Sequence, residues 1–561
     1  MKIALAQLNF HIGNFESNTK KIVEAICNAR QHNVELIVFP ELAISGYPPR
    51  DFLDFEHFVK SCKKCIKEIA KECKDIGAII GSPGFNPNAK GKKLYNSAYL
   101  LYNGKIESVR HKSLLPNYDI FDEYRYFEPN TKFEIVHFKD LRIALTICED
   151  LWNITDNPLY TINPMDELMK QNPDVMINIA ASPFNYEQAL KRKKILKANI
   201  DKYHLPLFYV NHCGAQTELI FDGGSLAFDN KGKIVEELEY FKEGLAVFSL
   251  TSAKNKNKIE TNIQSEKQQS INLRTHQSEN TQISLIRRAL VTGINNYFEK
   301  LNFSKAILGL SGGIDSALVC ALAVEALGKE NVRGILLPSH FSSEHSITDA
   351  KKLAENLGIP YDIIPIEEAF NSIEHSLKPV FKGLPPFGLA EENMQARIRA
   401  IILMAIANKI GYILLNTSNK SEAAVGYGTI YGDMCGGLSV LGDVYKTQVY
   451  EIAKLINKEK EIIPQNTIDK APSAELRPGQ KDSDSLPEYD ILDKILYQYI
   501  ERSKGPDEII TMGFDSAMVH HVLKLVNTNE WKRYQTPPIL RVSPKAFGMG
   551  RRMPIAAKYL S

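Results

Sequence analysis

The stretch AILGLSGGIDSALVC, residues 306–320, constrains the fold of this chain more than any other. An apolar strand leads into a tight turn with two consecutive glycines, and an apolar helix follows, as in α/β folds. Glycine lets the backbone approach an anion, and a helix N-terminus offers unpaired N–H groups and the positive end of its dipole. The turn therefore predicts a phosphate site. However, the lysine of a Walker loop is missing and Asp315 adds a negative charge.

From residue 284 onward, four segments of the strand type alternate with helical segments. Their sequences are KAILGL, VRGILLP, PYDIIPI and YILLNTS. Strands separated by helices favour a doubly wound parallel sheet, whose ligands bind beyond the carboxyl ends of the strands. We therefore predict an α/β domain over residues 284–561, with the SGGIDS turn at its ligand-binding edge.

The first half of the chain, residues 1–250, mixes strands, helices and hairpins. Asn103-Gly104 separates AYLLY from KIESV, and DNKGK at 229–233 is a second hairpin signal. Hairpins among helices predict an α/β domain with a mixed sheet. Between the two halves, residues 251–283 are rich in Lys, Asn, Gln and Ser, which predicts a polar linker.

Length and composition agree with two globular domains. A chain of 561 residues exceeds what one hydrophobic core usually supports. The net charge of +2 gives no electrostatic reason to expect nucleic acid or membrane as a partner. Eight scattered cysteines and the absence of a long apolar N-terminal run favour a reducing cytoplasm. Cys62, Cys65 and Cys73 lie in a helical pattern without a completing metal-ligand pair, so we expect them to be ordinary core thiols.

Three polar residues of the first half follow apolar strands or lie beside a hairpin. They are Glu41 in LIVFPEL, Lys112 in SVRHKSLLPN and Cys148 in RIALTICEDLW. A thiol nucleophile must lose its proton, and a nearby carboxylate can act as general base. A lysine can neutralise the oxyanion that forms when the thiolate adds to a carbonyl. Together these side chains fit amide hydrolysis.

A Cys–His dyad is the alternative arrangement for Cys148. It would use His111, His204 or His212. His111 should point away from its neighbour Lys112 on an extended segment, which favours the Glu–Lys arrangement.

The segments FPELAISGYPPRDFL, HKSLLPNYDIFDEYRYFEP and ICEDLW resemble the nitrilase superfamily, specifically the glutaminase domain of the glutamine-dependent NAD synthetases. The resemblance implies an α-β-β-α sandwich over residues 1–250 with a Glu–Lys–Cys triad. It also implies that Tyr118 and Ser182 hold glutamine. Where the family usually has a basic residue, this chain has Gln188, and Lys191 one helical turn later is a substitute.

The SGGIDS signature resembles the N-type ATP pyrophosphatases, which have an adenine nucleotide alpha hydrolase-like fold. This resemblance implies that Asp315 holds Mg²⁺ bridging phosphate oxygens, so its charge need not repel ATP. It assigns ATP binding to the residues of the turn and to a threonine after the last predicted strand: Gly309, Leu310, Ser311, Gly312, Gly313, Ile314, Asp315, Ser316 and Thr417.

Further segments, including EENMQARIRA (391–400) and LLNTSNKSEAAVGYGTIYGD (414–433), look like NAD synthetase. The resemblance implies that Asn393, Glu422 and Lys532 contact deamido-NAD, and that Glu422 also binds Mg²⁺. Lys446 and Ser473 are expected near phosphates. The basic residues of the C-terminal segment are expected to face phosphates as well: Lys532, Arg533, Arg541, Lys545, Arg551 and Arg552.

Both resemblances together imply a glutamine-dependent NAD synthetase. In such an enzyme ATP would adenylate the nicotinate carboxylate of deamido-NAD, and ammonia from glutamine, led through a buried passage, would displace AMP. The resemblance also implies a homo-oligomer with small-molecule substrates.

Two alternative functions remain open. One is a tRNA-modifying enzyme with the SGGxDS signature, which would need a basic RNA-binding face or a metal-binding domain. The other is an amidase with a non-catalytic C-terminal module.

Overall fold

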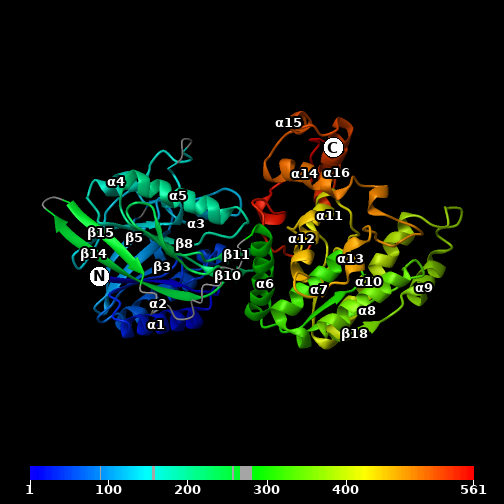
Figure 1. The fold of residues 1–561 in the computed structure, drawn as a ribbon, viewed down its shortest axis with the longest axis horizontal. Coiled ribbons are helices and arrows are strands. Elements are labelled where there is room, and N and C mark those ends of the chain that lie inside the picture. Colours follow the sequence, from blue (N-terminus) through cyan, green and yellow to red (C-terminus); the bar gives the residue numbers. More distant parts are fainter. Residues whose placement is uncertain (89, 155–157, 256–257, 266–280, 561) are drawn as a thin grey trace. The chain divides into compact units, whose positions relative to one another are not determined.

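The computed structural model describes residues 1–88, 90–154, 158–255, 258–265 and 281–560. The chain divides into two compact units, Met1–Ser278 and Glu279–Ser561, which Figure 1 colours from blue to green and from green to red. Each unit has its own sheets and its own hydrophobic core. None of the helices in the described ranges is long and apolar enough to span a bilayer.

The first unit contains two large sheets. One has the strand order β15-β14-β1-β2-β3-β4-β5, the other the order β13-β12-β9-β8-β7-β6. The strands of the first are β1 Lys2–Gln7, β2 Leu36–Val38, β3 Gly77–Phe85, β4 Leu94–Tyr102, β5 Lys105–His111, β14 Gly244–Asn255 and β15 Lys258–Ser265. Those of the second are β6 Val136–Phe138, β7 Leu141–Ile147, β8 Val175–Ala180, β9 Leu207–Asn211, β12 Leu226–Phe228 and β13 Ile234–Glu237. A separate pair is formed by β10 Cys213–Gln216 and β11 Leu219–Asp222.

The sheets are layered between helices. Along β1, Ile3 and Leu5 belong to the core shared with the second sheet, whereas Ala4 and Ala6 face α1 (Phe15–Gln31) and α2 (Glu56–Glu72). This alternation follows from the two-residue period of a strand. On the other side, α4 (Pro164–Met169) and α5 (Gln188–Tyr203) cover the second sheet, as Figure 1 shows. The predicted α-β-β-α sandwich is confirmed.

Both predicted hairpins form. Asn103 and Gly104 connect β4 to β5 with φ angles of 48° and 78°, the left-handed conformation that a two-residue hairpin turn requires. The turn at 229–233 connects the antiparallel strands β12 and β13.

The cysteines of the helical pattern also lie as expected. Cys62 and Cys65 of α2, and Cys73 just after this helix, are buried in the apolar core.

The polar linker predicted over 251–283 is too long. Strand β14 continues to Asn255 and pairs with β15, and α6 begins at Gln282. Strand pairing is made by backbone hydrogen bonds, and an edge strand is often polar because apolar edges invite aggregation. Because this segment is polar, its sequence did not predict these strands. The rest of the predicted linker, 266–280, lies outside the described residues.

The second unit has a sheet of parallel strands in the order β18-β17-β16-β19-β20. The strands are β16 Ala306–Gly309, β17 Val332–Leu336, β18 Tyr361–Ile363, β19 Ile413–Asn416 and β20 Leu438–Ser439. The chain reverses its winding direction between β16 and β19, so a crevice is expected beyond the carboxyl ends of these two strands. The predicted doubly wound sheet is confirmed.

Helices of two groups surround this sheet. Those connecting or flanking the strands are α6 Gln282–Lys300, α7 Ile314–Leu327, α8 Glu344–Leu357, α9 Glu367–Leu377, α10 Leu389–Ile410, α11 Lys420–Val425, α12 Lys446–Ile456 and α13 Gln465–Asp469. Near the C-terminus follow α14 Tyr489–Leu496, α15 Pro506–Thr511, α16 Ser516–Thr528 and α17 Glu530–Arg533. The buried side chains of α14, α15 and α16 form one apolar cluster with those of α11.

Two candidate catalytic sites

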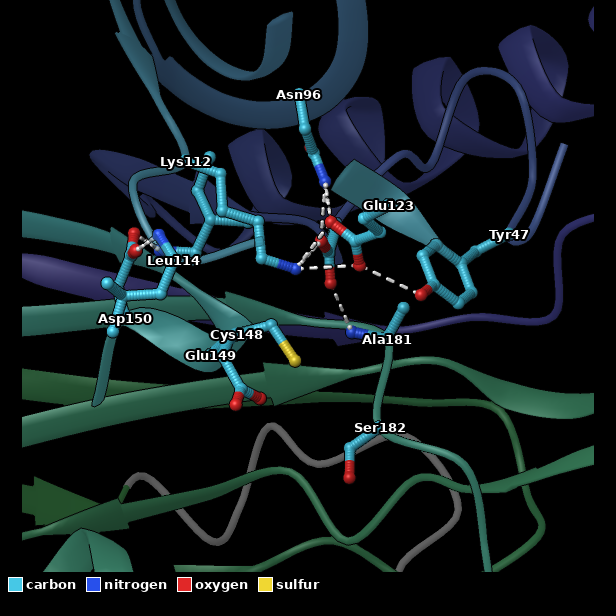
Figure 2. Close-up of polar contacts among 12 residues, drawn as sticks. Tyr47, Asn96, Lys112, Leu114, Glu123, Cys148, Glu149, Asp150, Ala181 and Ser182 are labelled. Carbon is cyan, nitrogen blue, oxygen red and sulfur yellow. Dashed lines mark hydrogen bonds and ion pairs between the residues drawn. The ribbon is translucent and has the colours of Figure 1, made fainter. Parts of the chain in front are cut away.

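Cys148 lies at a sharp turn at the end of a central strand. Strand β7 ends at Ile147, and a short 3₁₀ turn, Cys148–Leu151, follows directly. Cys148 has a φ of 44°, a conformation that non-glycine residues rarely adopt and that is common at functional sites. The turn leaves Cys148 6% exposed, and Figure 2 shows its sulfur between the Lys112 ammonium and the Ser182 side chain.

Asp150 fixes this turn against the segment that carries Lys112. Its carboxylate accepts hydrogen bonds from the backbone N–H groups of Ser113 (3.0 Å), Leu114 (2.8 Å) and Ile147 (3.0 Å). Burial raises the pKa of Asp150 to about 6, and these hydrogen bonds favour its charged form. One carboxylate therefore holds the turn that carries Cys148 against the segment that carries Lys112.

Lys112 is fully buried between two carboxylates. Its Nζ donates to Glu41 Oε1 at 2.7 Å and to both oxygens of Glu123 at 2.8 Å. Glu123 belongs to α3 (Glu123–Tyr126) and also accepts a hydrogen bond from the Tyr47 hydroxyl at 2.9 Å. Asn96 Nδ2 donates to Glu41 Oε1 at 2.6 Å. These contacts hold the ammonium in one position.

The electrostatics of this cluster suit a general base. Burial raises the pKa of Glu41 to about 7, the attraction of Lys112 opposes that rise, and the charge of Glu123 adds to it. The pKa of Lys112 is raised because both carboxylates outweigh its burial, so it stays an ammonium. Burial also raises the pKa of the Cys148 thiol. The resting thiol therefore keeps its proton, and Glu41 is placed to accept it.

The histidines have other partners. His111 Nδ1 lies 2.8 Å from Ser97 Oγ, and its ring stacks on Tyr95. His212 Nε2 lies 2.5 Å from the backbone oxygen of Glu41. His204 ends α5 in a left-handed conformation. None of these contacts involves Cys148, so the geometry favours the Glu–Lys arrangement.

The three residues expected to hold the substrate lie beside Cys148. The Tyr118 hydroxyl donates to the Glu149 carboxylate at 2.8 Å, and Glu149 directly follows Cys148. Ser182 follows Ala181, whose N–H donates to Glu41 Oε2 at 2.9 Å. Figure 2 shows Ser182 on the same side of Lys112 as Cys148 and Glu149.

Gln188, which stands where the family usually has a basic residue, is hydrogen-bonded to Ser182. Its Nε2 donates to Ser182 Oγ at 3.1 Å. Lys191, one turn further along α5, places its Nζ 5.6 Å from the centre of the Trp152 ring, which follows the nucleophile turn. The structure thus brings Gln188 to Ser182 and Lys191 to the segment of Cys148.

A cavity of about 310 Å³ opens at the carboxyl ends of β16 and β19. All residues of the 309–316 turn except Gly312 line it, together with Thr417, Glu422, Lys446 and Ser473. The turn leads directly into α7, which begins at Ile314, so the first backbone amides of this helix have no helical partners. The crevice expected from the strand order is therefore present.

Gly312 explains why this turn needs glycine. Its φ is 76°, and a Cβ atom there would lie 2.3 Å from the backbone oxygen of Ser346, near the start of α8. Gly313 differs, because its φ is −81° and a Cβ would meet only the Ser311 hydroxyl, at 3.2 Å. Only Gly312 is required by a close backbone approach.

We expect Gly312→Ala to destabilise the protein by about 2 kcal/mol or more, because the methyl group would have to displace the backbone of α8. Gly313→Ala at the neighbouring position should change stability by less than about 1 kcal/mol. Thermal unfolding of both variants measures the difference. Equal losses for the two alanines would contradict this account of the turn.

Asp315 belongs to a partly buried network of charges. Lys446 Nζ donates to Asp315 Oδ2 at 2.5 Å and to Glu422 Oε1 at 3.2 Å. Asn419 Nδ2 donates to Asp315 Oδ1 at 2.9 Å. Burial raises the pKa of Glu422 to about 8, with Lys446 opposing and Asp315 adding to the rise. Two carboxylates thus share one ammonium at the mouth of the SGGIDS turn.

Asn393 and Lys532 lie next to the cavity rather than on its surface. Asn393 accepts a hydrogen bond from the Thr429 hydroxyl at 2.6 Å. Lys532 Nζ donates to the backbone oxygens of Gly426 (2.7 Å) and Gly428 (3.1 Å). Both therefore contact the 426–433 segment, from which Tyr427, Gly432 and Asp433 line the cavity.

The expectation that the C-terminal arginines face phosphates is wrong for three of them. Arg533 and Arg551 both bind the Glu530 carboxylate at 2.7 Å, and Arg533 also donates to backbone oxygens of α11. Arg541 donates to the backbone oxygen of Pro544 at 2.7 Å. Their guanidinium groups hold the C-terminal segment in place, so the density of positive charge in the sequence reflects folding here.

Two family models match the chain. That of the carbon-nitrogen hydrolases matches residues 2–256, and that of NAD synthase matches residues 286–536. The fold and the two sites thus define a protein that joins a carbon-nitrogen hydrolase unit to an NAD synthase unit.

Full-length relatives share this organisation. The chain is 45% identical to the glutamine-dependent NAD(+) synthetase of Synechocystis sp., over 99% of both chains. It is 40% identical to that of Thermotoga maritima, over 100% of this chain and 99% of that protein. A solved structure of the glutamine-dependent NAD+ synthetase from Acinetobacter baumannii, in complex with ADP, is 37% identical and superposes with a TM-score of 0.75 over 99% of this chain and 98% of that chain.

The chain belongs to the glutamine-dependent NAD(+) synthetase family. It has glutamine-dependent NAD(+) synthetase activity and is a ligase of NAD biosynthesis with an ATP-binding NAD synthase domain. A tRNA-modifying enzyme and an amidase with a non-catalytic C-terminal module are therefore excluded as readings of its function.

Proposed function

We propose that the two units divide the reaction, with glutamine hydrolysis in the first and amidation of deamido-NAD in the second. The observation that carries this proposal is the pair of polar centres in one chain. Cys148 lies beside the buried Lys112–Glu41 pair in the first unit, and Asp315 with Glu422 faces the SGGIDS cavity in the second.

At the first site Cys148 is the nucleophile and Glu41 the general base. The thiol proton moves to Glu41 while sulfur bonds to the amide carbon of glutamine, and the Lys112 ammonium stabilises the oxyanion. The carbon–nitrogen bond then breaks, and ammonia leaves with the proton from Glu41. Water, deprotonated by the same carboxylate, cleaves the thioester to glutamate and restores the thiol.

Glutamine is held by Tyr118, Ser182 and Gln188. Because Gln188 is neutral, it orients the Ser182 hydroxyl but cannot pair with the free carboxylate of the substrate. Lys191, which lies over Trp152 next to the nucleophile turn, supplies the positive charge for that carboxylate.

We expect the rate of glutamate release to fall as pH decreases, with a midpoint near the pKa of Glu41, about 7. Below that pH Glu41 is protonated and cannot accept the thiol proton. Glu123→Gln should move this acid limb to lower pH, because the charge of Glu123 raises the pKa of Glu41. Glu134→Gln, which removes an exposed carboxylate 3.7 Å from Arg110, is the control. An unchanged limb in Glu123→Gln would contradict the assignment of Glu41.

At the second site the amides of Gly309–Ser316 hold the phosphates of ATP, and Thr417 contacts the nucleotide. Asn393, Glu422 and Lys532 contact deamido-NAD. A carboxylate oxygen of the nicotinate bonds to the α-phosphorus, and the bond to the bridging oxygen breaks, so its electron pair leaves with diphosphate. Ammonia then adds to the carboxyl carbon, loses a proton, and displaces AMP to give NAD(+).

The carboxylates of Asp315 and Glu422 fit a magnesium ion. They lie on one side of the cavity and already share one cation, Lys446, and Mg²⁺ in nucleotide sites typically takes one or two carboxylates plus phosphate oxygens. When bound, Mg²⁺ would neutralise phosphate charge as diphosphate leaves. Homo-oligomeric assembly and a cytoplasmic location complete the proposal.

Deamido-NAD labelled with ¹⁸O in its nicotinate carboxylate tests the adenylation step. The label should appear in AMP when the enzyme forms NAD(+), because one carboxylate oxygen stays on the α-phosphorus. Label found in diphosphate, or in neither product, would show that the carboxylate is activated in another way.

A further inference from the structure

Helix α10 turns one charged side chain toward the nucleotide cavity. Ala396, Arg399, Ala400 and Leu403 all line the cavity, and their spacing places them on one face of the helix. Apolar residues elsewhere on α10, including Ile398, belong to the core of the second unit. Arg399 therefore stands alone as a cation among small and apolar side chains.

The guanidinium of Arg399 has few partners. Within the described ranges, its one hydrogen bond runs from Nε to the backbone oxygen of Leu337, at 3.0 Å. No described carboxylate lies within ion-pair distance of it. Burial lowers the pKa of Arg399 to about 10, and only the longer-range charges of Asp433 and Glu475 oppose this. A guanidinium carries five N–H donors, so its remaining donors are available to a ligand.

The other described cations that line the cavity are already paired. Lys446 binds Asp315 and Glu422. Lys470 donates to the Ser346 hydroxyl at 3.1 Å and lies 3.6 Å from Asp349. An anionic ligand entering this cavity therefore meets Arg399 as its unpaired cation.

We propose that Arg399 binds the α-phosphate of ATP and still binds this phosphate after the adenylate has formed. This inference rests on the proposed function of the second site. The 309–316 turn offers backbone amides to the leaving diphosphate, while Ala396, Ala400 and Leu403 offer an apolar surface for the nucleoside. The α-phosphate joins these two parts of ATP, and Arg399 lies on the same helix face as the apolar surface.

The proposed contact also has a consequence for the rate. Negative charge develops around the α-phosphorus as the carboxylate adds and diphosphate leaves, and a guanidinium held by Leu337 needs no reorganisation to stabilise it. Arg399→Lys keeps the charge but loses the planar fork that matches a phosphate, so it should restore only part of the binding.

Titration calorimetry of the full-length protein with AMP, ATP, magnesium diphosphate and adenosine tests the inference. Arg399→Gln should weaken AMP and ATP binding by about 10- to 100-fold. It should leave diphosphate and adenosine binding unchanged within about twofold, and unchanged adenosine binding shows that the site has folded. Lys409→Gln, an exposed cation at the end of α10, is the matched control and should change none of the four affinities.

Three results would overturn the inference. Weaker diphosphate binding with unchanged AMP binding would place Arg399 at the leaving group. Equal losses for AMP and adenosine would place it at the base. Wild-type protein that binds AMP no more tightly than adenosine would remove the α-phosphate contact altogether. Because AMP binding does not depend on adenylation, the ¹⁸O experiment on wild-type protein tests the proposed function separately.

Discussion

Replacing Cys148 with alanine is expected to abolish NAD(+) formation from glutamine, by at least about 10³-fold, as loss of a catalytic nucleophile usually does. Formation from ammonium salts should continue, because the second unit contains its own cavity and charged groups. The two rates are measured with deamido-NAD and ATP at saturation. Cys148→Ser should behave like the alanine variant, since a hydroxyl is a far weaker nucleophile in this setting.

The control for this experiment is Cys27→Ala, which removes a thiol from α1 far from the nucleophile turn. It should retain both activities. Loss of ammonium-dependent activity in Cys148→Ala, with the protein still folded, would show that the two units do not divide the reaction.

Replacing Asp315 with asparagine is expected to reduce NAD(+) formation from both nitrogen donors by at least about 100-fold. The substitution keeps the shape of the side chain but removes the charge that binds Lys446 and that we assign to Mg²⁺. Asp362→Asn removes the same charge from an ion pair with Arg333 near the protein surface and should have little effect.

The magnesium dependence of Asp315→Asn separates two roles of this carboxylate. If Asp315 holds the metal, the variant should need more Mg²⁺ for half-maximal activity and should recover in part as Mg²⁺ is raised. The opposite result is a variant that shows the magnesium dependence of the wild type and regains no activity at any Mg²⁺ concentration. That result would mean that Asp315 acts only by positioning Lys446.

Local sequence signals predicted most of the fold. Asn103-Gly104 is tied to one type of hairpin turn, and Gly312 of the SGGIDS turn adopts a conformation that other residues avoid. The polar strand β15 gave no such signal. Its pairing with β14 depends on backbone hydrogen bonds, which leave no mark in composition.

The first candidate site was predicted in part. Glu41, Lys112 and Cys148 carry types of side chain that point to amide hydrolysis, and each lies at a strand end or beside a hairpin. Glu123 was missed because its role depends on the packing of α3 against Lys112. The two residues are 11 positions apart in the sequence, and no sequence pattern predicts their contact. Asp150 was missed for a similar reason, since it acts through the backbone of residues 113 and 114.

The second site was also predicted only in part. The SGGIDS motif identified the residues of the turn, but the partners of Asp315 come from segments over 100 residues away, at Asn419 and Lys446. The C-terminal arginines show the opposite error. A basic segment suggested phosphate binding, yet Arg533 and Arg551 converge on Glu530, because a buried carboxylate and buried guanidiniums require each other.

In the proposed reaction, one nitrogen atom passes from glutamine at the first site to deamido-NAD at the second. The proposal requires that ammonia released from glutamine reach the activated carboxylate before it mixes with ammonium in solution. The enzyme can be supplied with glutamine labelled with ¹⁵N in its amide, together with unlabelled ammonium at equal concentration, and the NAD(+) analysed by mass spectrometry. We predict that wild-type protein makes mostly labelled NAD(+) and that Cys148→Ala makes only unlabelled product. Label in the product of Cys148→Ala, or its absence from that of the wild type, would contradict the account.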